Sequence, residues 1–234
     1  MFKYLLLFVL FSNSAFAEKC IKDIFNVGVG FDSAVFKGKR SNKKLELVSS
    51  GGLSVNLDWI IFCTDSKIEY RPYIYSRSYS FKNEGELDGA PNSIESLSLG
   101  VVTSKNITLF GNTYNLSMDI GQREDFTIIE TFDDVAPGEL NNIYGALGIS
   151  SSIYRKKRLD LSIGGNLGLL IPDNGGIELG SLVRLESRAF YKLTKKSSAV
   201  LNLFFEYYSQ RNKDSDTEVS RQELGLRGSY LFRF

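Results

Sequence analysis

Alternation of apolar and polar residues, repeated along almost the whole chain, is the feature that most restricts its fold. In the clearest segment, residues 53–61, five large apolar side chains occupy every second position. A period of two residues is typical of β-strands with two different faces. Similar segments recur from Phe25 to the last residue, Phe234, and together with a tyrosine-rich stretch at residues 68–82 they predict ten strands. No segment has a helical period, so the expected fold class is all-β.

The connections between these segments are expected to alternate in length. The short ones are predicted at residues 63–67, 104–106, 155–158 and 194–198. The others are predicted at residues 37–44, 83–93, 130–142, 172–176 and 211–219, and four of these five contain eight or more residues. Tight turns at one end and longer loops at the other are typical of a transmembrane up-and-down barrel, and an even number of strands returns both termini to the tight-turn side. Eight or twelve strands are alternatives, because residues 107–130 could form one long strand or two short ones.

The first 17 residues differ from the rest. A single basic residue, Lys3, precedes an apolar block of eight residues, and Ala15-Phe16-Ala17 matches the small-x-small pattern of a signal peptidase site. We therefore expect a signal peptide at residues 1–17 and an exported domain at residues 18–234. The exported part would carry 27 basic and 27 acidic residues, a balance that argues against a nucleic-acid partner.

The end of the chain has its own pattern. In "GSYLFRF" three aromatic residues, Tyr230, Phe232 and Phe234, alternate with other residues up to the final position. Together with the export signal and the ten alternating segments, this ending resembles bacterial outer-membrane β-barrels. The resemblance covers the whole exported chain and implies a single transmembrane antiparallel barrel with both termini in the periplasm. It also implies that the barrel-assembly machinery reads the terminal aromatic residues as an assembly signal.

The physical chemistry of the bilayer agrees with this resemblance. Strands survive in hydrocarbon only when a closed sheet pairs every backbone amide. The apolar face of each segment extends over about 9–11 residues of the chain, the length that a tilted strand needs to cross the bilayer. The alternative fold is a secreted lipocalin-like barrel, in which the apolar face would point inward.

If the apolar face contacts lipid, the polar face lines the lumen. The acids expected there are Asp32, Glu46, Asp58, Glu69, Asp119, Asp160, Glu178, Glu186, Glu206 and Glu223. The bases expected there are Arg71, Arg77, Arg123, Arg184, Arg188, Lys192, Arg227 and Arg233. This near balance favours internal ion pairing and a narrow or plugged lumen, and Arg184, Glu186 and Arg188 on one strand are candidates for its lining.

The tyrosine-rich strand can face either way. Its aromatic face carries Tyr73, Tyr75, Arg77 and Tyr79, and a lipid-facing orientation would place Arg77 in hydrocarbon. The neighbouring strands offer small lumenal residues, namely Ser50, Gly52, Ser54, Ser96, Ser98 and Gly100. We therefore expect the tyrosines inside, either as simple filling or as a lining for a sugar-like or aromatic solute.

Two cysteines, Cys20 and Cys63, flank the first two strands on the expected periplasmic side. In an exported chain such a pair predicts a disulfide bond, since the periplasm is oxidising.

Enzymatic function is not expected. The chain has no histidine, which removes the usual general base, the Ser-His nucleophile and most transition-metal sites, and no cofactor is expected. The expected function is a narrow porin-like or largely plugged barrel for small solutes, embedded in outer-membrane lipid. The alternatives are a structural or adhesion barrel whose outer loops contact lipopolysaccharide or a partner, and the lipocalin-like binding protein.

Overall fold

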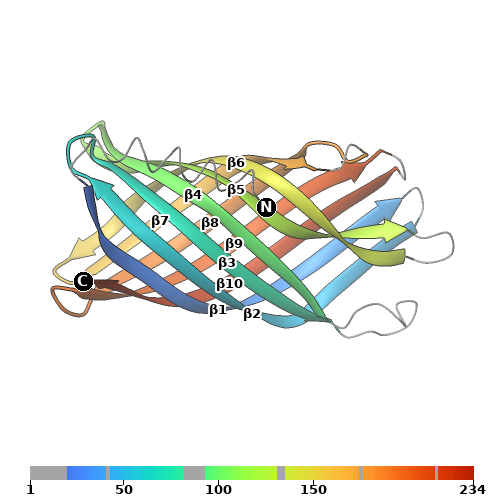
Figure 1. Ribbon diagram of the computed structural model, residues 1–234, viewed down its shortest axis with the longest axis horizontal. Coiled ribbons are helices and arrows are strands. Elements are labelled where there is room, and N and C mark those ends of the chain that lie inside the picture. The colour runs from blue at the N-terminus through green and yellow to red at the C-terminus, as the bar shows by residue number, and fades with distance from the viewer. Residues whose placement is uncertain (1–19, 41–42, 82–92, 131–134, 174–175, 214–215) are drawn as a thin grey trace.

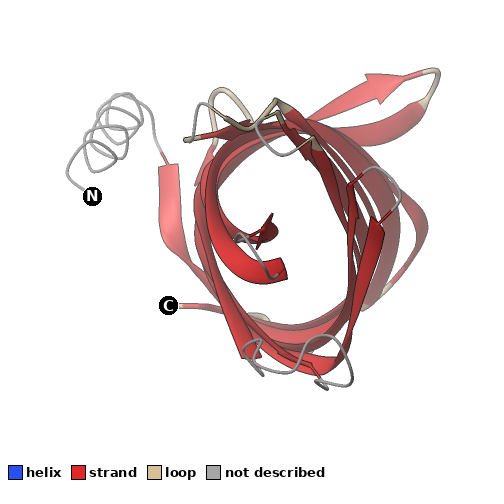
Figure 2. Cartoon of the chain, turned by 90° about the vertical axis from the view of Figure 1, so that its right-hand side faces the viewer, coloured by secondary structure: helices blue, strands red, loops and turns tan. Residues whose placement is uncertain are grey.

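The chain folds into a closed antiparallel barrel of ten strands (Figure 1). The computed structural model describes residues 20–40, 43–81, 93–130, 135–173, 176–213 and 216–234. The strands are β1 (Cys20–Arg40), β2 (Lys43–Cys63), β3 (Ile68–Phe81), β4 (Ser93–Leu109), β5 (Asn112–Glu130), β6 (Val135–Lys156), β7 (Leu159–Pro172), β8 (Gly180–Lys192), β9 (Ser197–Asn212) and β10 (Thr217–Arg233). Each strand pairs with its neighbours in the sequence, and β10 pairs with β1 to close the ring, which Figure 2 shows from one end. The predicted strand number and topology are confirmed.

The two ends of the barrel differ. One end, called the turn end below, holds the β2–β3, β4–β5, β6–β7 and β8–β9 connections together with the beginning of β1 and the end of β10. The opposite end, called the loop end, holds the other five connections. The predicted signal peptide and most of the predicted 83–93 loop lie outside the described residues. Among the described residues, no helix has the length and apolar character needed to cross a membrane.

The outer wall is apolar around the middle of the barrel. Large apolar side chains point outward from several strands, and more than 60% of Val29, Leu53, Leu147 and Leu167 is exposed. An apolar face on the outside contradicts the lipocalin-like alternative and fits a hydrocarbon environment.

The strands are longer than a bilayer requires, and the pattern inverts near the loop end. Strands of 13–22 residues exceed the roughly 9–11 residues that cross the hydrocarbon. Near the loop end Phe36 and Val219 are buried inside, whereas Lys37 and Glu218 are exposed outside. This part of the barrel therefore has an apolar interior and a polar exterior. Because the strands continue beyond the part with an apolar outer face, much of the predicted 37–44 and 130–142 loops is strand.

A β-bulge explains two wrong predictions on β2. The pairing between β2 and its neighbours shifts between Ser49 and Gly51, and Gly51 has a φ of 128°, a conformation that glycine adopts readily. The extra residue reverses which face the side chains on one side of the bulge point to, relative to those on the other side. Before the bulge, Ser49 therefore faces the interior in place of Ser50. Glu46 likewise lies on the outside, where it pairs with Lys37 at 3.3 Å.

The tight turn between β4 and β5 lies later than predicted. It is formed by Phe110 and Gly111 rather than by residues 104–106, and both residues have positive φ angles, 51° and 79°. A two-residue hairpin with this backbone matches the twist of its strands. The turn projects from the turn end, so that the Phe110 side chain is almost fully exposed.

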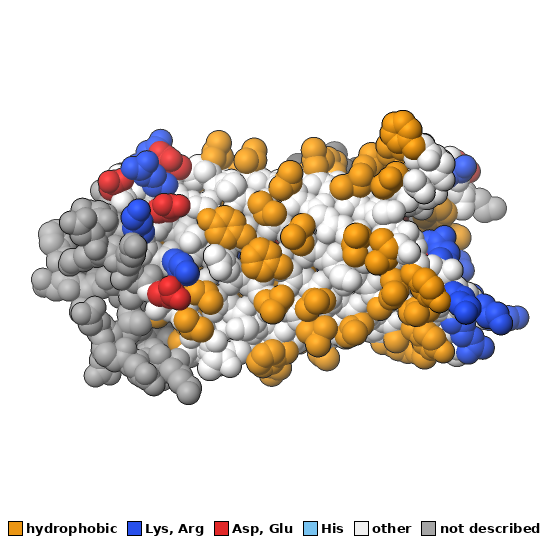
Figure 3. Space-filling view, turned by 180° about the vertical axis from the view of Figure 1, so that it is seen from behind, with side chains coloured by type: hydrophobic (Ala, Val, Ile, Leu, Met, Phe, Trp, Pro, Cys, Tyr) orange, Lys and Arg blue, Asp and Glu red, His pale blue; other side chains and the backbone are white. Residues whose placement is uncertain are grey.

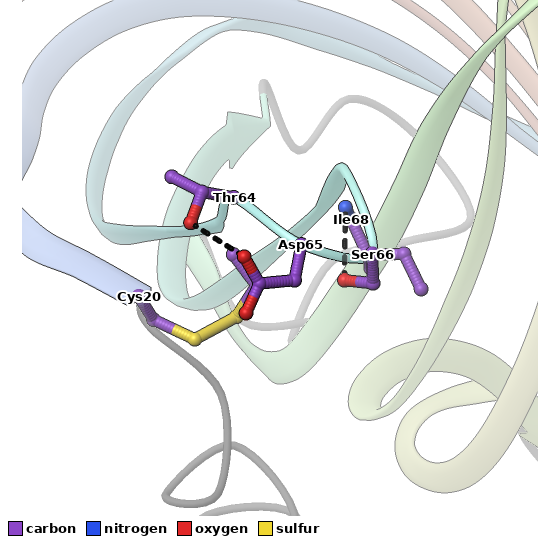
Figure 4. Close-up of a disulfide and its surroundings, with 6 residues drawn as sticks. Cys20, Thr64, Asp65, Ser66 and Ile68 are labelled. Carbon is purple, nitrogen blue, oxygen red and sulfur yellow. Dashed lines mark hydrogen bonds between the residues drawn. A yellow bond between two sulfur atoms is a disulfide. The ribbon is translucent and has the colours of Figure 1, made fainter.

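The first strand is fastened to both of its neighbours, β2 and β10, at the turn end. A disulfide joins Cys20 on β1 to Cys63 on β2 (Figure 4), as the sequence predicted. Beside it, the Phe25 ring on β1 lies 5.8 Å from Trp59, 6.0 Å from Phe232 and 5.7 Å from Phe234. The terminal aromatic residues thus pack across the seam where β10 meets β1.

The disulfide should stabilise the barrel measurably. It encloses 42 residues between its cysteines, so replacing both by serine should lower the free energy of unfolding by about 3–4 kcal/mol on the chain-entropy account. Urea unfolding in micelles, followed by the fluorescence of the single tryptophan, measures this difference. A reductant should weaken the wild type and leave the double serine variant unchanged. Alkylation of both cysteines without prior reduction would contradict the bond.

Candidate functional site

A network of six charged side chains occupies the middle of the lumen. Its members are Arg77 on β3, Arg123 and Asp125 on β5, Glu206 on β9, and Arg221 and Glu223 on β10. No more than 4% of each of these side chains is exposed. Three arginines therefore face three carboxylates in a region shielded from water. We call these six residues the lumenal network.

Glu206 is the centre of the lumenal network. Its carboxylate lies 2.7 Å from Arg221 and 2.8 Å from Arg123. Arg77 and Arg184 lie 3.7 Å from the same carboxylate. Four guanidinium groups thus surround one carboxylate, and this attraction offsets the cost of burying its charge.

Of the remaining pairs, one connects opposite sides of the barrel, one connects strands three positions apart, and one lies within β5. Arg221 lies 3.2 Å from Asp125, and the strands that carry them, β10 and β5, are five positions apart in the ring of ten. Arg77 donates a hydrogen bond of 2.6 Å to Glu223, and Arg123 lies 2.8 Å from Asp125. The lumenal network therefore crosses the full width of the lumen.

Arginine supplies every base among the described charges of the lumen. The seven arginines are Arg71, Arg77, Arg123, Arg184, Arg188, Arg221 and Arg227. The eight acids are Asp32, Asp58, Glu69, Asp119, Asp125, Glu186, Glu206 and Glu223. The guanidinium group offers several donors in a fixed plane and can contact several carboxylates at once, which suits a network that spans many strands. The near balance of charge expected from the sequence is present.

Uncharged side chains fill space beside the lumenal network. One cluster consists of Ala34, Phe36, Leu47, Tyr79 and Phe81. A second consists of Tyr144, Ala146, Leu170, Leu182 and Tyr208. Asn142 and Gln210 exchange two hydrogen bonds of 2.9 and 3.2 Å, and Asn142 also donates to Asp125 at 3.1 Å. Together with the charges, these buried residues fill much of the described lumen on the loop-end side.

A polar cavity of about 380 Å³ lies on the turn-end side of the lumenal network. On its wall Asp119 accepts hydrogen bonds of 3.1 Å from both Tyr73 and Tyr144. Asp58 accepts one of 2.6 Å from Asn26 and one of 3.1 Å from Asn56. Carboxylates, amides and guanidinium groups thus surround a space large enough for a small polar molecule.

Arg227 is the lining residue with the most unused hydrogen-bonding capacity. Its guanidinium carbon lies 4.0 Å from the centre of the Tyr75 ring and 5.3 Å from that of Phe204. Its Nε and one Nη atom have no hydrogen-bond partner among the described residues. Stacking between two rings holds the guanidinium in place, and these two buried donors have no acceptor among the described residues.

The predicted lining residues fall into two groups. Tyr73, Arg184, Glu186 and Arg188 line the cavity, and Arg188 lies 3.3 Å from Glu186. Tyr75 and Arg77 lie at the boundary between the cavity and the lumenal network, and Tyr79 is buried in the first uncharged cluster. Tyr75 also donates a hydrogen bond of 2.7 Å to Asp32.

Other predictions for the lumen were wrong or incomplete. Glu178 was expected inside, but it precedes β8 and lies 3.9 Å from Lys213 at the loop end. Asp160, Lys192 and Arg233 were also expected to line the lumen, and they lie near the turn end, at the ends of their strands. Asp125 and Arg221 were not expected in the lumen, although each occupies the same face of its strand as Arg123 or Glu223. If the alternation of faces had been followed two residues beyond the apolar part of each strand, both side chains would have been predicted to point into the lumen.

The described residues contain no group of three or more His, Cys, Asp and Glu side chains arranged to hold a metal ion. The expectation that no cofactor binds stays a prediction.

The protein resembles solved structures in its fold, but its sequence matches no known family. No family model matches the chain, and no curated protein matches it either. The outer membrane protease OmpT from Escherichia coli matches with a TM-score of 0.52 and 9% identity, over 92% of this chain and 98% of that one. An outer membrane channel from Pseudomonas putida F1 matches with a TM-score of 0.52 and 11% identity, over 93% of this chain and 97% of that one.

The chain has the fold of an outer-membrane β-barrel. At these identities the likeness concerns the fold alone, since one match is a protease and the other a channel. The lumen of this barrel is therefore the basis for its proposed function.

The lumenal network gives a prediction about stability. Changing Glu206 to glutamine removes the charge that four arginines share, so the barrel should lose about 3–5 kcal/mol of unfolding free energy. Urea unfolding in detergent micelles measures the loss. The matched control is Glu46→Gln, the same change in an exposed pair with Lys37, which should cost less than about 1 kcal/mol. Equal effects of the two substitutions would show that the buried charge is not needed.

Proposed function

We propose that this protein is a non-enzymatic barrel of the bacterial outer membrane whose lumen is closed at rest and passes small solutes poorly. The observation that carries the proposal is the contact between Arg221 and Asp125, 3.2 Å apart on opposite walls of the barrel. Because both side chains are buried together with the rest of the lumenal network, no continuous water-filled path is expected. A ten-stranded barrel is also near the size at which side chains fill the interior.

The proposed membrane orientation places the turn end in the periplasm. Tight turns face the periplasm in barrels of this class, and the disulfide at the same end suits an oxidising compartment. The apolar belt would lie in membrane lipid. Phe234 would be read by the barrel-assembly machinery, and exposed bases such as Lys37 and Lys39 at the loop end would meet lipopolysaccharide phosphates.

The cavity on the turn-end side of the lumenal network is the proposed place for a small solute. Arg227 offers free donors there, and Glu186 and Asp119 offer acceptors. The balance of charge favours a small polar molecule that carries both donors and acceptors over a simple anion. Tyr73 and Tyr75 would supply apolar ring surface for a sugar-like or aromatic part of such a molecule.

The absence of histidine from the sequence supports the non-enzymatic reading. The structural likeness to a protease concerns the fold and does not bring its chemistry to this chain.

A structural or adhesion barrel is the second candidate. β5 and β6 contain 19 and 22 residues, about twice the length that crosses the hydrocarbon. Their loop-end parts would stand above the membrane, where a partner would contact them. A barrel of this kind would show no conductance even after its lumen was widened.

Conductance in planar bilayers tests the proposal. The wild type should give small or intermittent currents with weak ion selectivity. Removing one base and one acid together, with Arg77→Ser and Glu223→Ser, keeps the net charge and removes side-chain volume from the lumenal network. This variant should conduct several times more than the wild type.

The matched control removes an ion pair from the outer wall. Lys37→Ser with Glu46→Ser should leave the current unchanged, and all three proteins should first show a heat-dependent shift in gel migration to establish folding. A large and steady current through the wild type would refute the closed lumen. A folded Arg77 and Glu223 variant without any current would favour the structural barrel.

A further inference from the structure

Two adjacent turns at the turn end carry an unusual concentration of positive charge. The β6–β7 turn provides Arg155, Lys156, Lys157 and Arg158, and the β8–β9 turn provides Lys192, Lys195 and Lys196. We call these seven residues the basic cluster. All of them are exposed, and the backbone amide of Lys192 donates a hydrogen bond of 2.8 Å to the carbonyl of Arg158, which holds the two turns side by side.

Very little negative charge accompanies the basic cluster. Within residues 153–160 and 190–198 the single acid is Asp160, and its carboxylate lies 2.6 Å from Arg155. Six of the seven bases therefore have no acid within their own turns. Figure 3 shows these side chains as a basic patch at the right-hand end of the molecule.

The opposite end shows that this imbalance is local. At the loop end the described bases lie beside acids: Lys37 beside Glu46, and Lys213 beside Glu178. Figure 3 likewise shows acidic side chains among the basic ones at the left-hand end. Among the residues whose side chains the structure describes, bases without a nearby acid are thus concentrated on one side of the turn end.

An apolar groove lies on the outer wall of the same strands. It has a volume of about 590 Å³ and is lined by outward side chains such as Ile149 on β6, Ile163 and Gly165 on β7, Leu185 on β8, and Leu203 on β9. Gly165 has no side chain, and Ser187, which lies opposite Ile163, is small. The wall is therefore lower here than over the leucines and isoleucines around it, and an elongated apolar group can fit into the depression.

The groove and the basic cluster are separated by a distance that a single lipid can span. Ile163 lies five residues from Arg158 along β7, and Leu185 lies seven residues from Lys192 along β8. At about 3.3 Å per residue these separations are roughly 16–23 Å along the strands. In strands tilted by about 40° this corresponds to roughly 12–18 Å of depth, close to the 15 Å or so of one leaflet's hydrocarbon.

Exposed tyrosines mark the level between the two features. Tyr154 and Tyr191 are about 45% exposed and belong to the ends of β6 and β8, next to the basic cluster. Tyrosine is enriched where hydrocarbon meets the headgroups, because its ring is apolar and its hydroxyl is polar. The basic cluster therefore lies at headgroup level and the groove lies at acyl-chain level.

We propose that the outer wall formed by β6–β9 binds one anionic phospholipid from the leaflet at the turn end. Its phosphate-bearing headgroup would lie on the basic cluster, and one acyl chain would occupy the groove. A headgroup with net negative charge is favoured over a zwitterionic one, whose own amine already neutralises its phosphate. This site lies outside the lumen and is independent of any transport function.

Native mass spectrometry of the full-length protein in detergent tests the proposal. The probes are phosphatidylglycerol and phosphatidylethanolamine with identical acyl chains, added at increasing concentration. One molecule of phosphatidylglycerol should be retained at concentrations at which phosphatidylethanolamine is not, with at least a tenfold difference in apparent affinity. Equal retention of the two lipids would overturn the proposal.

Charge variants test the headgroup contact. Lys156→Gln, Lys157→Gln and Lys196→Gln together should weaken phosphatidylglycerol binding by up to about a hundredfold, since each base near an anionic headgroup is worth about a tenfold effect or less. The matched control changes Lys37, Lys39 and Lys213 at the loop end to glutamine and should bind normally. Equal losses in both triple variants would show general charge attraction and overturn the site.

Filling the groove tests the acyl-chain contact. Gly165→Leu should reduce retention of long-chain phosphatidylglycerol but leave binding of its dihexanoyl form unchanged, because the short chains do not reach the groove. The control is Gly145→Leu on β6, an exposed outer-face glycine with no atom within 4 Å of the added Cβ. If Gly165→Leu does not fold, Ser187→Leu fills the same groove. Unchanged long-chain binding in the filled variant would remove the groove from the proposal.

Discussion

The barrel depends on the pairing of the buried charges of the lumenal network. Glu206 is buried among four arginines, and Asp125 and Glu223 neutralise those that Glu206 shares. Buried charges are costly unless each one has its partners, so this arrangement is stable only when β3, β5, β9 and β10 keep their register. A slip of one residue in any of them would turn an inward charge toward lipid. The charges that would close the lumen in the proposed function therefore also help to select the alignment of the strands.

The barrel combines two environments along its axis. Near the turn end it behaves as a membrane barrel, with apolar residues outside and a polar cavity inside. Near the loop end it resembles a soluble barrel, since Phe36 and Val219 are inside and Lys37 is outside. The lumenal network lies next to this change of pattern. It separates the polar cavity from a part of the lumen that is filled largely by aromatic and aliphatic side chains.

This change of pattern also explains what the sequence could and could not predict. Period-two alternation with an apolar face is a strong signal within the bilayer, so the strand number, the closed barrel and the inward direction of Arg77 and Tyr75 could be predicted. Beyond the bilayer the apolar and polar faces exchange, and the strands were therefore predicted to end too early. Arg221 and Asp125 lie in these extensions and were missed. Glu46 and Ser50 were misplaced because a single bulge at Gly51 reverses the faces of β2, and local composition does not reveal which residue will bulge.

Accessibility of the cavity to a membrane-impermeant thiol reagent in whole cells tests the central claim most directly. Ser117→Cys places a thiol in the cavity on the turn-end side of the lumenal network, and Glu218→Cys places one on the exposed surface of the loop end. A reagent added outside intact cells should modify the Glu218→Cys variant quickly. It should modify the Ser117→Cys variant only after the outer membrane is permeabilised, because the cavity opens toward the periplasm in the proposed orientation. Equally rapid modification of both variants in intact cells would show that the lumen is open and would contradict the proposed closed lumen.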